Sequence, residues 1–404
     1  KQGCPFYDQY LAYKDSDVII FNSAKYLTET LMDKKPETSL EIIDECDEFL
    51  DSLANQEKIS ISRLLSSLSV LFFKDKSKQK IIESLIDIGN LIKNSKETSF
   101  SGKIFELRGS QVEILLEIIL KNSDLIEENE IEETSYLFHL DKVAKTFMDF
   151  FDETFFSFEK NENDVMVHLV TTNLEKRLKE LIEKNNIFVM MSGTIHSEIV
   201  LKSIFGLDRF KIVEAETKNQ GELIKRKYGY EIDCSYNNFQ KNKVTREQYL
   251  KAFSKSVSLA KRPTLVHLTS FSDLPTDYEK RMYSLDNLPN QFELIDEQEK
   301  DPLGKKINDF KNKKIDLLFT TKCSRGVDFP GDICNSIVIS RFPYPNISGI
   351  FWKILKQTKP SYFNSFYMDK ARREFLQRIY RGLRSKDDKV ELLSPDIRVL
   401  DFEF

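Results

Sequence analysis

Three residues near the end of the chain, Gln377, Arg381 and Arg384, have types and spacings that suit phosphate binding. They are separated by four and three positions, so on a helix they would share one face. Two guanidinium groups on one face can bind phosphate oxygens bidentately. The spacing therefore predicts a helical face that receives a triphosphate.

Arginine-rich helices are more often solvated surfaces, and this alternative must be weighed against the flanking residues. The run 315–319 reads as a short buried strand that leads into the turn 324–331, Ser-Arg-Gly-Val-Asp-Phe-Pro-Gly. A second apolar run, 336–339, follows that turn. A strand, a glycine turn, a strand and then a basic helix indicate an ordered site rather than scattered charge.

Asp44 and Glu45 follow a predicted strand at 40–43. Ligands bind open parallel sheets at the carboxyl ends of their strands, and in P-loop enzymes carboxylates there hold Mg²⁺ and position the attacking water. The same pair could merely cap the helix that follows. The arginine string favours the metal interpretation, because a nucleotide needs both a metal side and an arginine side.

The composition sets wider limits. A chain of 404 residues is long enough for two or three domains, and its net charge of −5 leaves only a local stripe for a nucleic-acid path. No apolar run approaches the length of a membrane span. The five cysteines are scattered and no secretory signal is present, so we expect a soluble protein of a reducing cytoplasm.

The region 54–170 is predicted to be a helical insertion, because apolar residues recur at helical spacing in 59–73, 81–92 and 112–120. An acidic stretch, 127–133, reads as a solvated loop or helix end. A cluster of phenylalanines in this region could stack bases, but core packing is the preferred interpretation. Its members are Phe147, Phe150, Phe151, Phe155, Phe156 and Phe158.

The remaining predicted elements flank these motifs. Before the insertion we expect a strand at 17–21 and a helix at 23–32, and after it a strand at 187–191 that ends at Ser192-Gly193-Thr194. Further on we expect a helix at 245–259 and a strand at 264–268. The four histidines have no ligand spacing and are read as structural, and the lack of paired cysteines argues against zinc.

Six strings occur in a fixed order along the chain. They are Cys4-Pro5-Phe6-Tyr7, Ile42-Ile43-Asp44-Glu45-Cys46-Asp47, Met191-Ser192-Gly193-Thr194, the run 264–271, Gly326-Val327-Asp328-Phe329-Pro330-Gly331, and the run 377–384. This order resembles the iron-sulfur XPD/DinG family of superfamily-2 DNA helicases, and Arg341-Phe342-Pro343-Tyr344-Pro345 occupies the place of the family's Pro-Tyr-Pro turn. The resemblance spans nearly the whole chain, although 50–170 matches only in position and helical character.

The resemblance implies an α/β fold with two RecA-like motor domains, the first incomplete, and a helical arch-like insertion. The implied boundaries are 1–53 for part of motor domain 1 with the end of the iron-sulfur region, 54–170 for the insertion, 171–209 for the return to motor domain 1, and 210–404 for motor domain 2. The implied activity is ATP-driven movement from 5′ to 3′ along single-stranded DNA with duplex unwinding, in DNA repair.

The resemblance also implies roles for the residues that bind nucleotide. Asp44 would hold Mg²⁺ through water, and Glu45 would orient or deprotonate the attacking water. Arg381 and Arg384 would reach the γ-phosphate as arginine fingers, which are worth roughly 10³ to 10⁵ in rate in related chemistry. The further nucleotide-binding residues would be Gln377, Gly326 and Asp328.

A second set of residues would couple hydrolysis to DNA or touch the DNA backbone. Its members are Ser192, Gly193, Thr194, Ser270 and Arg325. Cys4 would be the fourth ligand of a [4Fe-4S] cluster whose other cysteines precede this chain. The implied partners are ATP, single-stranded and forked duplex DNA and subunits of a repair complex, in the cytoplasm with the nucleoid if the source is prokaryotic.

The sequence departs from the family pattern at several positions. Tyr380 replaces the usual glycine of Gln-x-x-Gly-Arg-x-x-Arg, and Arg325 replaces the usual glutamate before the motif V glycine. Asp47 replaces the histidine of Asp-Glu-Ala-His, a change we expect to be mild. Gly-x-x-x-x-Gly-Lys-Ser/Thr does not occur, so we expect that loop to precede Lys1 and this chain as written not to hydrolyse ATP.

Two other functions fit the same motifs. One is a catalytically silent, helicase-shaped scaffold that binds DNA, which Tyr380 and Arg325 favour. The other is a related RNA helicase or single-strand nuclease, since backbone contacts do not distinguish DNA from RNA without groups directed at the 2′-hydroxyl.

Overall fold

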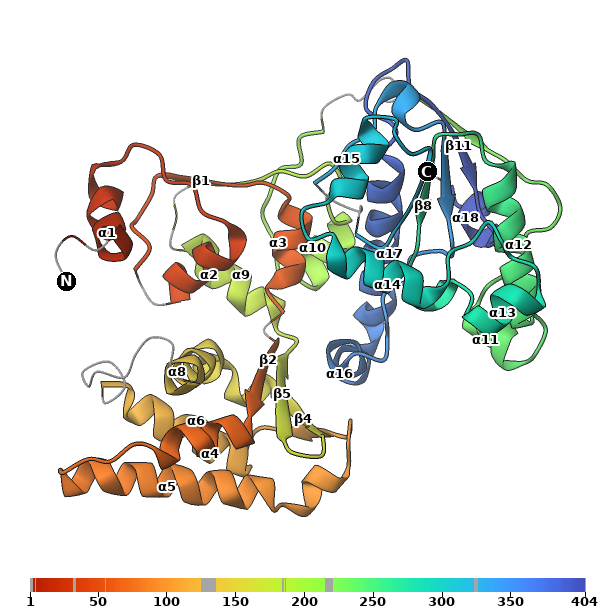
Figure 1. Ribbon diagram of the computed structural model, residues 1–404. Helices are drawn as coiled ribbons and strands as arrows, with labels where there is room; N and C mark the ends of the chain where they lie inside the picture. The colour runs from red at the N-terminus through yellow and green to blue at the C-terminus, as the bar shows by residue number, and fades with distance from the viewer. Residues whose placement is uncertain are drawn as a thin grey trace. The chain divides into compact units, whose positions relative to one another are not determined.

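The computed structural model describes residues 3, 5–31, 34–54, 56–124, 136–183, 185, 187–214, 221–322 and 326–403 (Figure 1). These residues form two compact units. The first comprises Lys1–Phe210 with Asn346–Phe366, and the second comprises Lys211–Pro345 with Tyr367–Phe404. Each unit has its own buried apolar core.

The first unit contains a two-stranded parallel sheet, in which β1 (Leu40–Ile43) pairs with β6 (Ile187–Met190). Short helices accompany it: α1 (Pro5–Asp15), α2 (Ser23–Leu31), α3 (Cys46–Ser52), α9 (Leu174–Glu183) and α10 (Glu198–Ser203). The strands predicted at 40–43 and 187–191 and the helix predicted from Ser23 are confirmed.

The strand predicted at 17–21 is wrong. Residues 18–22 are irregular, and the side chains of Val18 and Ile20 are 77% and 91% exposed. A run of alternating apolar residues becomes a strand only where another strand supplies its hydrogen bonds, and β1 pairs within the described residues with β6 alone.

The first unit also contains a four-stranded antiparallel sheet, ordered β2-β5-β4-β3. Its strands are β2 (Gln56–Ser60), β3 (Ile104–Glu106), β4 (Thr154–Lys160) and β5 (Val165–Thr171). The helices of this region are α4 (Ile61–Ser69), α5 (Lys76–Lys93), α6 (Gln111–Lys121) and α8 (Tyr136–Phe147), with 3-10 turns at Lys96–Ser99 and Met148–Glu153. The purely helical prediction for 54–170 is therefore wrong, although its helices near 61, 81 and 112 are confirmed.

The phenylalanines of this insertion form its core, as preferred from the sequence. Five of the six are buried, and four of these five pack with leucines and isoleucines of α4, α5, α6 and α8. The short polar strands β2 and β3 explain why the sheet was missed: Gln-Glu-Lys-Ile-Ser and Ile-Phe-Glu carry little of the apolar alternation that identifies a strand. The acidic stretch 127–133 lies outside the described residues.

An aromatic cluster completes the first unit. Helix α16 (Ile350–Thr358) contributes Phe351 and Trp352, whose rings contact Phe366 at centroid distances of 6.3 and 5.4 Å. Phe366 also contacts Phe205, just after α10, at 6.0 Å. The chain's one tryptophan is therefore a probe of the first unit.

The second unit is built on a five-stranded, fully parallel sheet ordered β7-β11-β10-β8-β9. Its strands are β7 (Glu222–Lys225), β8 (Thr264–His267), β9 (Leu317–Thr320), β10 (Ser336–Ile339) and β11 (Lys389–Leu393). The strands predicted at 264–268, 315–319 and 336–339 are confirmed, and β7 and β11 were not predicted.

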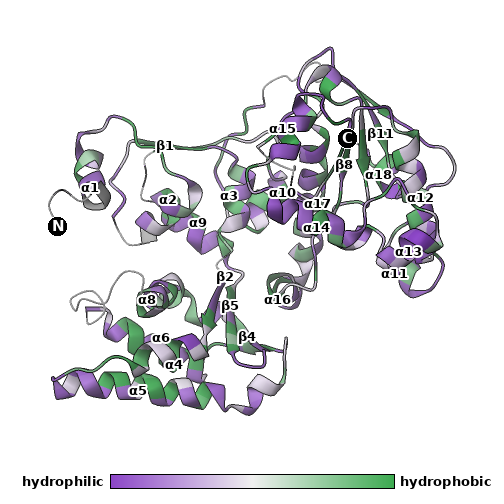
Figure 2. Ribbon diagram, viewed as in Figure 1, coloured by the Kyte–Doolittle hydropathy of each residue, from purple (hydrophilic) through white to green (hydrophobic). Residues whose placement is uncertain are grey.

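Helices surround this sheet. They are α11 (Tyr236–Gln240), α12 (Arg246–Leu259), α13 (Asp277–Met282), α14 (Gln291–Lys300), α15 (Lys305–Lys311), α18 (Ile397–Asp401) and, from Tyr367 onward, α17 (Pro360–Ile379). Figure 2 shows the strands mainly in the apolar colour and helices such as α12 and α13 in mixed or polar colours. The helix predicted at 245–259 is confirmed as α12.

Alternate residues of a strand point to opposite faces of the sheet, and both faces are covered here. Ile337 and Ile339 pack with Phe375 of α17 in one core, whereas Val338 packs with Tyr249 of α12 in another. Both cores are continuous with buried apolar residues of β8 and β11. The carboxyl ends of β8, β9 and β10 therefore lie at one edge of a rigid sheet.

Within the part of the chain that the structure describes, every helix is too short or too polar to cross a membrane.

Candidate nucleotide site

The carboxylates Asp44 and Glu45 lie in a tight turn between β1 and α3, and both are exposed. The turn is tied to the end of β6, because the amide of Met191 donates to the carbonyl of Ile43 (2.8 Å) and that of Cys46 donates to the carbonyl of Met191 (2.9 Å). Glu45 has φ 48° and ψ 46°, a left-handed conformation that is uncommon outside glycine. Such strained residues cluster at functional sites.

Asp47 connects this turn to the Ser192-Gly193-Thr194 string. Its carboxylate is fully buried and accepts hydrogen bonds from the hydroxyls of Ser192 (2.8 Å) and Thr194 (3.1 Å). The Thr194 amide in turn donates to the Ser192 hydroxyl (3.1 Å). From the sequence, Asp47 was interpreted only as a mild replacement for the histidine of Asp-Glu-Ala-His, and this link was missed. The one available signal was its position as the fourth residue of the Asp44–Asp47 motif.

A second contact supports the same connection. The imidazole of His196 is 1% exposed, and its Nε2 lies 3.1 Å from Oδ1 of Asp51 on α3. Helix α3 is therefore tied to the segment after β6 by two carboxylates, Asp47 and Asp51. A movement of the Ser-Gly-Thr string would be transmitted to α3, which begins directly after Glu45.

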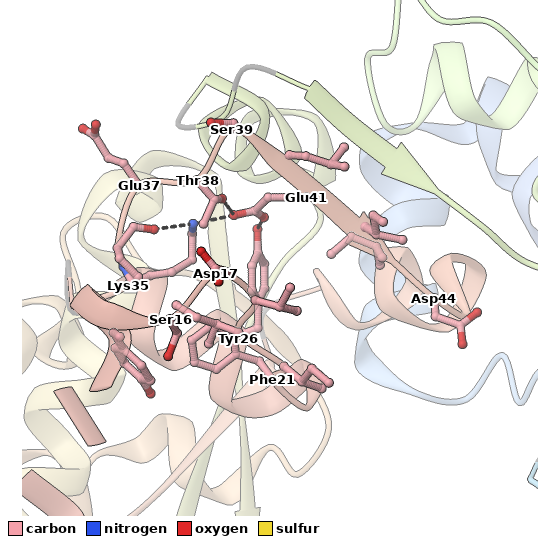
Figure 3. A pocket seen from close by; sticks show the side chains of 18 of the residues that line it. Ser16, Asp17, Phe21, Tyr26, Lys35, Glu37, Thr38, Ser39, Glu41 and Asp44 are labelled. Carbon is pink, nitrogen blue, oxygen red and sulfur yellow. Dashed lines mark hydrogen bonds and ion pairs between the residues drawn. The ribbon is translucent and has the colours of Figure 1, made fainter. Parts of the chain in front are cut away.

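A cavity of about 710 Å³ flanks β1, with Asp44 among its lining residues (Figure 3). Its polar centre is Glu41, which pairs with Lys35 and also accepts hydrogen bonds from Thr38 (2.9 Å) and Tyr26. Burial and the Glu41 carboxylate raise the pKa of Tyr26. The ammonium of Lys35 is already paired with Glu41, and Asp17, Glu37 and Asp44 also line the cavity, so it is poorly suited to hold phosphate groups.

The arginine string has a different geometry from the one predicted. Helix α17 ends at Ile379, so Arg381 and Arg384 lie in the turn after the helix rather than on one helical face with Gln377. The helical-face prediction is therefore wrong. Gly382 allows the turn to lie against the sheet, since a Cβ there would be 3.2 Å from both Ile337 and Val390.

Both arginines nevertheless converge on one carboxylate, that of Asp328. Nη1 of Arg381 lies 2.9 Å from Oδ1 of Asp328, and Arg384 forms an ion pair with the same oxygen. Arg381 also donates to the carbonyl of Val327 (3.2 Å), and its own carbonyl accepts from the Phe329 amide (2.8 Å). The turn after α17 and the 326–331 segment thus form one charged surface.

Asp388 was not singled out from the sequence, yet it organises this surface. It is 3% exposed, and its carboxylate accepts from the amides of Gly331 (2.8 Å), Arg384 (2.6 Å) and Ser385 (2.6 Å). Burial favours the neutral acid, but these hydrogen bonds outweigh it and lower the pKa of Asp388. Asp388 therefore holds the backbone that carries Arg384.

Tyr380, which replaces the usual glycine, is accommodated by the core. Its ring is partly buried and packs against the apolar cluster of the second unit that contains Ile379 and Leu383. The larger side chain is directed into existing packing, so the turn that carries Arg381 forms with a tyrosine in this position.

Ser270 lies at the carboxyl end of β8, in a turn organised by the buried Asp273. Oδ2 of Asp273 accepts from the amide and hydroxyl of Thr269 (3.0 and 2.6 Å), the Ser270 amide (3.2 Å) and the Ser340 hydroxyl (2.6 Å). Its Oδ1 pairs with Arg341 (3.1 Å). The turn therefore presents Ser270 on a rigid support.

Of the remaining predicted site residues, the structure describes two and leaves two outside the described ranges. Gln377 is buried in the last turn of α17, and Gly326 has φ 73°, which a side chain would disfavour. Arg325 and Cys4 lie outside the described residues.

The described residues fit some of the predicted cofactors and do not test another. Asp44 and Glu45 supply the hard oxygen ligands that Mg²⁺ accepts beside water and phosphate, and Arg381 and Arg384 supply phosphate ligands.

The predicted iron-sulfur ligand Cys4 lies outside the described residues, so the structure does not test that prediction. Cys46, Cys234 and Cys334 are buried, and burial raises the pKa of Cys334 to about 12. Within the described ranges, no three or more His, Cys, Asp and Glu side chains gather in a group that could hold a metal ion by themselves.

Comparison with known proteins places these features in a helicase context. Residues 239–403 match the family model described as a helicase C-terminal domain. A probable ATP-dependent helicase of Methanocaldococcus jannaschii is 28% identical over 250 residues, which are 57% of this chain and 37% of that relative. The chain thus corresponds to little more than a third of the relative's length.

Two solved structures share the fold over most of the chain. An XPD helicase structure matches with a TM-score of 0.54 at 16% identity, covering 98% of this chain and 72% of its own. The Xpd4 structure of S. tokodaii has the same TM-score at 19% identity, covering 90% and 72%. The predicted resemblance is confirmed: the chain carries a helicase C-terminal domain, has XPD-like structural neighbours and is a distant homologue of a probable ATP-dependent helicase.

Proposed function

We propose that this chain provides the motor regions of an ATP-dependent DNA helicase of the XPD type. The proposal includes movement from 5′ to 3′ along single-stranded DNA, unwinding of forked duplexes and a role in DNA repair with partner subunits. The observation that carries it is the convergence of Arg381 and Arg384 on Asp328, in the turn that leads from α17 into β11 of a parallel sheet. Two guanidinium groups held together in this way are prepared to bind a phosphoryl group once it displaces the carboxylate.

The first unit contributes the complementary chemistry in this proposal. Asp44 would hold Mg²⁺ through water, and Glu45 would orient the attacking water. Bound Mg²⁺ would neutralise charge on the phosphate oxygens. Asp47 would transmit the state of the Glu45 turn to Ser192 and Thr194, since its carboxylate contacts both hydroxyls. Ser270 would contact a phosphate of the DNA backbone.

The test is ATP hydrolysis by the intact natural polypeptide that contains this chain, with and without single-stranded DNA. We expect DNA-stimulated turnover that Glu45→Gln and Arg384→Ala each reduce by roughly 10³-fold or more. Glu48→Gln, an exposed neighbour on α3, and Arg372→Ala, an exposed position on α17, are matched controls and should keep near-normal turnover. Normal turnover in either test variant would refute the role assigned to that residue.

A catalytically silent DNA-binding scaffold is the second candidate, favoured by Tyr380 in place of the usual glycine. The same assay separates the two. DNA binding without any ATP hydrolysis by the intact polypeptide would favour the scaffold over the motor.

A further inference from the structure

Arg378 is a buried arginine that the proposed mechanism does not use. It occupies a variable position of the Gln-x-x-Gly-Arg-x-x-Arg string, directly after Gln377, and lies in the last turn of α17. Its residue surface is only 9% exposed. Arginine is rarely buried to this extent unless an anion or several acceptors neutralise it.

The protein supplies little compensation for this charge. Nη1 of Arg378 is 3.5 Å from the carbonyl oxygen of Leu268, at the outer limit of a hydrogen bond, and Nε has no hydrogen-bond partner among the described residues. Arg373, on the same helix, offers an internal comparison. It is 3% exposed, but its Nε lies 2.9 Å from Oδ2 of Asp369.

Nearby acids do not take the place of such a partner. Asp273 influences Arg378 only at a distance, since its own oxygens accept from the Thr269–Ser270 turn and pair with Arg341. Glu374 also acts at a distance, and burial lowers the pKa of Arg378 despite both acids. Arg378 therefore carries a buried positive charge that no carboxylate pairs with directly among the described residues.

His267, at the end of β8, is affected by the positive charge of Arg378. Its ring is 2% exposed, and its pKa is well below the ordinary value because of burial and because of the charges of Arg378 and Arg381. A neutral histidine adds no charge of its own beside Arg378.

A purely structural explanation for the buried Arg378 is that the C-terminal end of α17 stabilises its charge, since helix C-termini attract cations. This field and the long contact to Leu268 would suffice for an arginine in water. They fall short for a buried one, because removing a guanidinium from water costs more than the end of a helix returns. Elsewhere on α17, the buried charge of Arg373 is compensated by the carboxylate of Asp369.

We propose that Arg378 is an additional phosphate-binding residue at the carboxyl end of β8. The carbonyl that it contacts belongs to Leu268, immediately before the turn that presents Thr269 and Ser270. The planar fork of N–H donors on a guanidinium matches phosphate oxygens. The phosphate belongs either to a nucleoside triphosphate or to the backbone of single-stranded DNA, so the inference rests on the proposed function and deepens it.

The experiment measures binding rather than hydrolysis, so its failure is distinguishable from failure of the motor proposal. Tripolyphosphate and an oligothymidylate serve as probes, each titrated over a series of salt concentrations against the intact polypeptide. The variants are Arg378→Met, which keeps the length of the side chain without its charge, and Arg378→Lys, which keeps the charge without the fork. Arg372→Met removes an exposed charge from the same helix, and Arg373→Met removes a paired buried one.

We expect Arg378→Met to weaken one probe by about 10-fold or more and Arg378→Lys to weaken it less. For the oligothymidylate, the slope of log affinity against log salt should also fall by about 0.7 for each phosphate that the variant no longer neutralises. Loss of tripolyphosphate binding assigns the phosphate to a nucleotide, and loss of oligothymidylate binding assigns it to DNA. Arg372→Met should stay within about twofold of the parent for both probes.

The unliganded protein provides an independent readout. Arg378→Met should melt at the same temperature as the parent or higher, because a buried charge without a carboxylate is removed, whereas Arg373→Met should melt lower because Asp369 is left without its arginine. The proposal is overturned if Arg378→Met binds both probes within twofold of the parent. It is equally overturned if Arg378→Met is as destabilised as Arg373→Met while Arg378→Lys binds both probes normally.

Discussion

The two parallel sheets of this protein contain similar strands in very different surroundings. Strand β1, Leu-Glu-Ile-Ile, leaves Ile42 57% exposed, whereas β10, Ser-Ile-Val-Ile, is completely buried. Helices cover both faces of the five-stranded sheet, with α17 on one core and α12 on the other. Apolar strand composition therefore does not determine burial, which depends on how many neighbouring layers the surrounding chain supplies.

The difference also separates two ways of holding a loop that carries candidate site residues. In the second unit the loops at the carboxyl ends of β8, β9 and β10 rest on a covered sheet. In the first unit the Glu45 turn rests on two strands, and its rigidity comes from side-chain contacts such as that of Asp47 with Ser192. Packing positions one set of loops, and buried polar contacts position the other.

The largest expected effect is a core truncation in the five-stranded sheet. Ile337→Ala should lower the free energy of unfolding of the second unit by about 2–5 kcal/mol, because it leaves a cavity in a closed core. The matched change Ile42→Ala should cost about 0.5 kcal/mol or less, because that side chain is more than half exposed. Amide hydrogen exchange in β10 and fluorescence of Trp352 report the two units separately. Equal losses would contradict the comparison.

An intermediate effect is expected at the polar contact of the first unit. Asp47→Ala removes a buried carboxylate that accepts from Ser192 and Thr194, and should lower the stability of the first unit by about 1–3 kcal/mol. The measurement is urea unfolding followed by Trp352 fluorescence. Ser192→Ala, which removes one of the two donors, should cost less. A negligible loss for Asp47→Ala would mean that packing also holds this turn.

The smallest effect concerns pH and Asp388 in the second unit. Its pKa is lower when folded than the unfolded value of about 3.9, so its stabilisation is present above that pH and is lost as pH falls through the folded pKa. The stability advantage of the parent over Asp388→Asn should therefore be largest near neutral pH and shrink below about pH 4. Denaturant midpoints across this range measure it, with the exposed neighbour Asp387→Asn as control. A constant advantage would exclude the linkage.

Much of the second sheet could be predicted from the sequence. Strands β8, β9 and β10 are short apolar runs bounded by polar or glycine-containing turns, and a fully buried parallel strand has this pattern. Strand β11 was missed because it closely follows the arginine string, and charged residues there obscure its apolar pattern. Strand β7, Glu-Leu-Ile-Lys, is too short and too polar at its ends to be recognised in isolation.

Other features depended on partners distant in the sequence. The run 17–21 has strand composition but remains irregular. Arg381 and Arg384 were expected to share a helical face, yet α17 ends before them and Asp328 brings them together. Asp47 and Asp388 were not recognised as organising residues because single aspartates are common in a chain that is 31% charged.

The sequence by itself determined which residues could do chemistry and their order along the chain, because residue type and local spacing are written in it. It was enough to indicate the helicase resemblance and to nominate the carboxylates and arginines. Tertiary structure alone decided that Asp328 holds both arginines, that Asp47 joins two motifs and that Arg378 is buried without a carboxylate partner among the described residues. Those relations arise when strands far apart in the chain pair, and no local pattern encodes the distances that pairing creates.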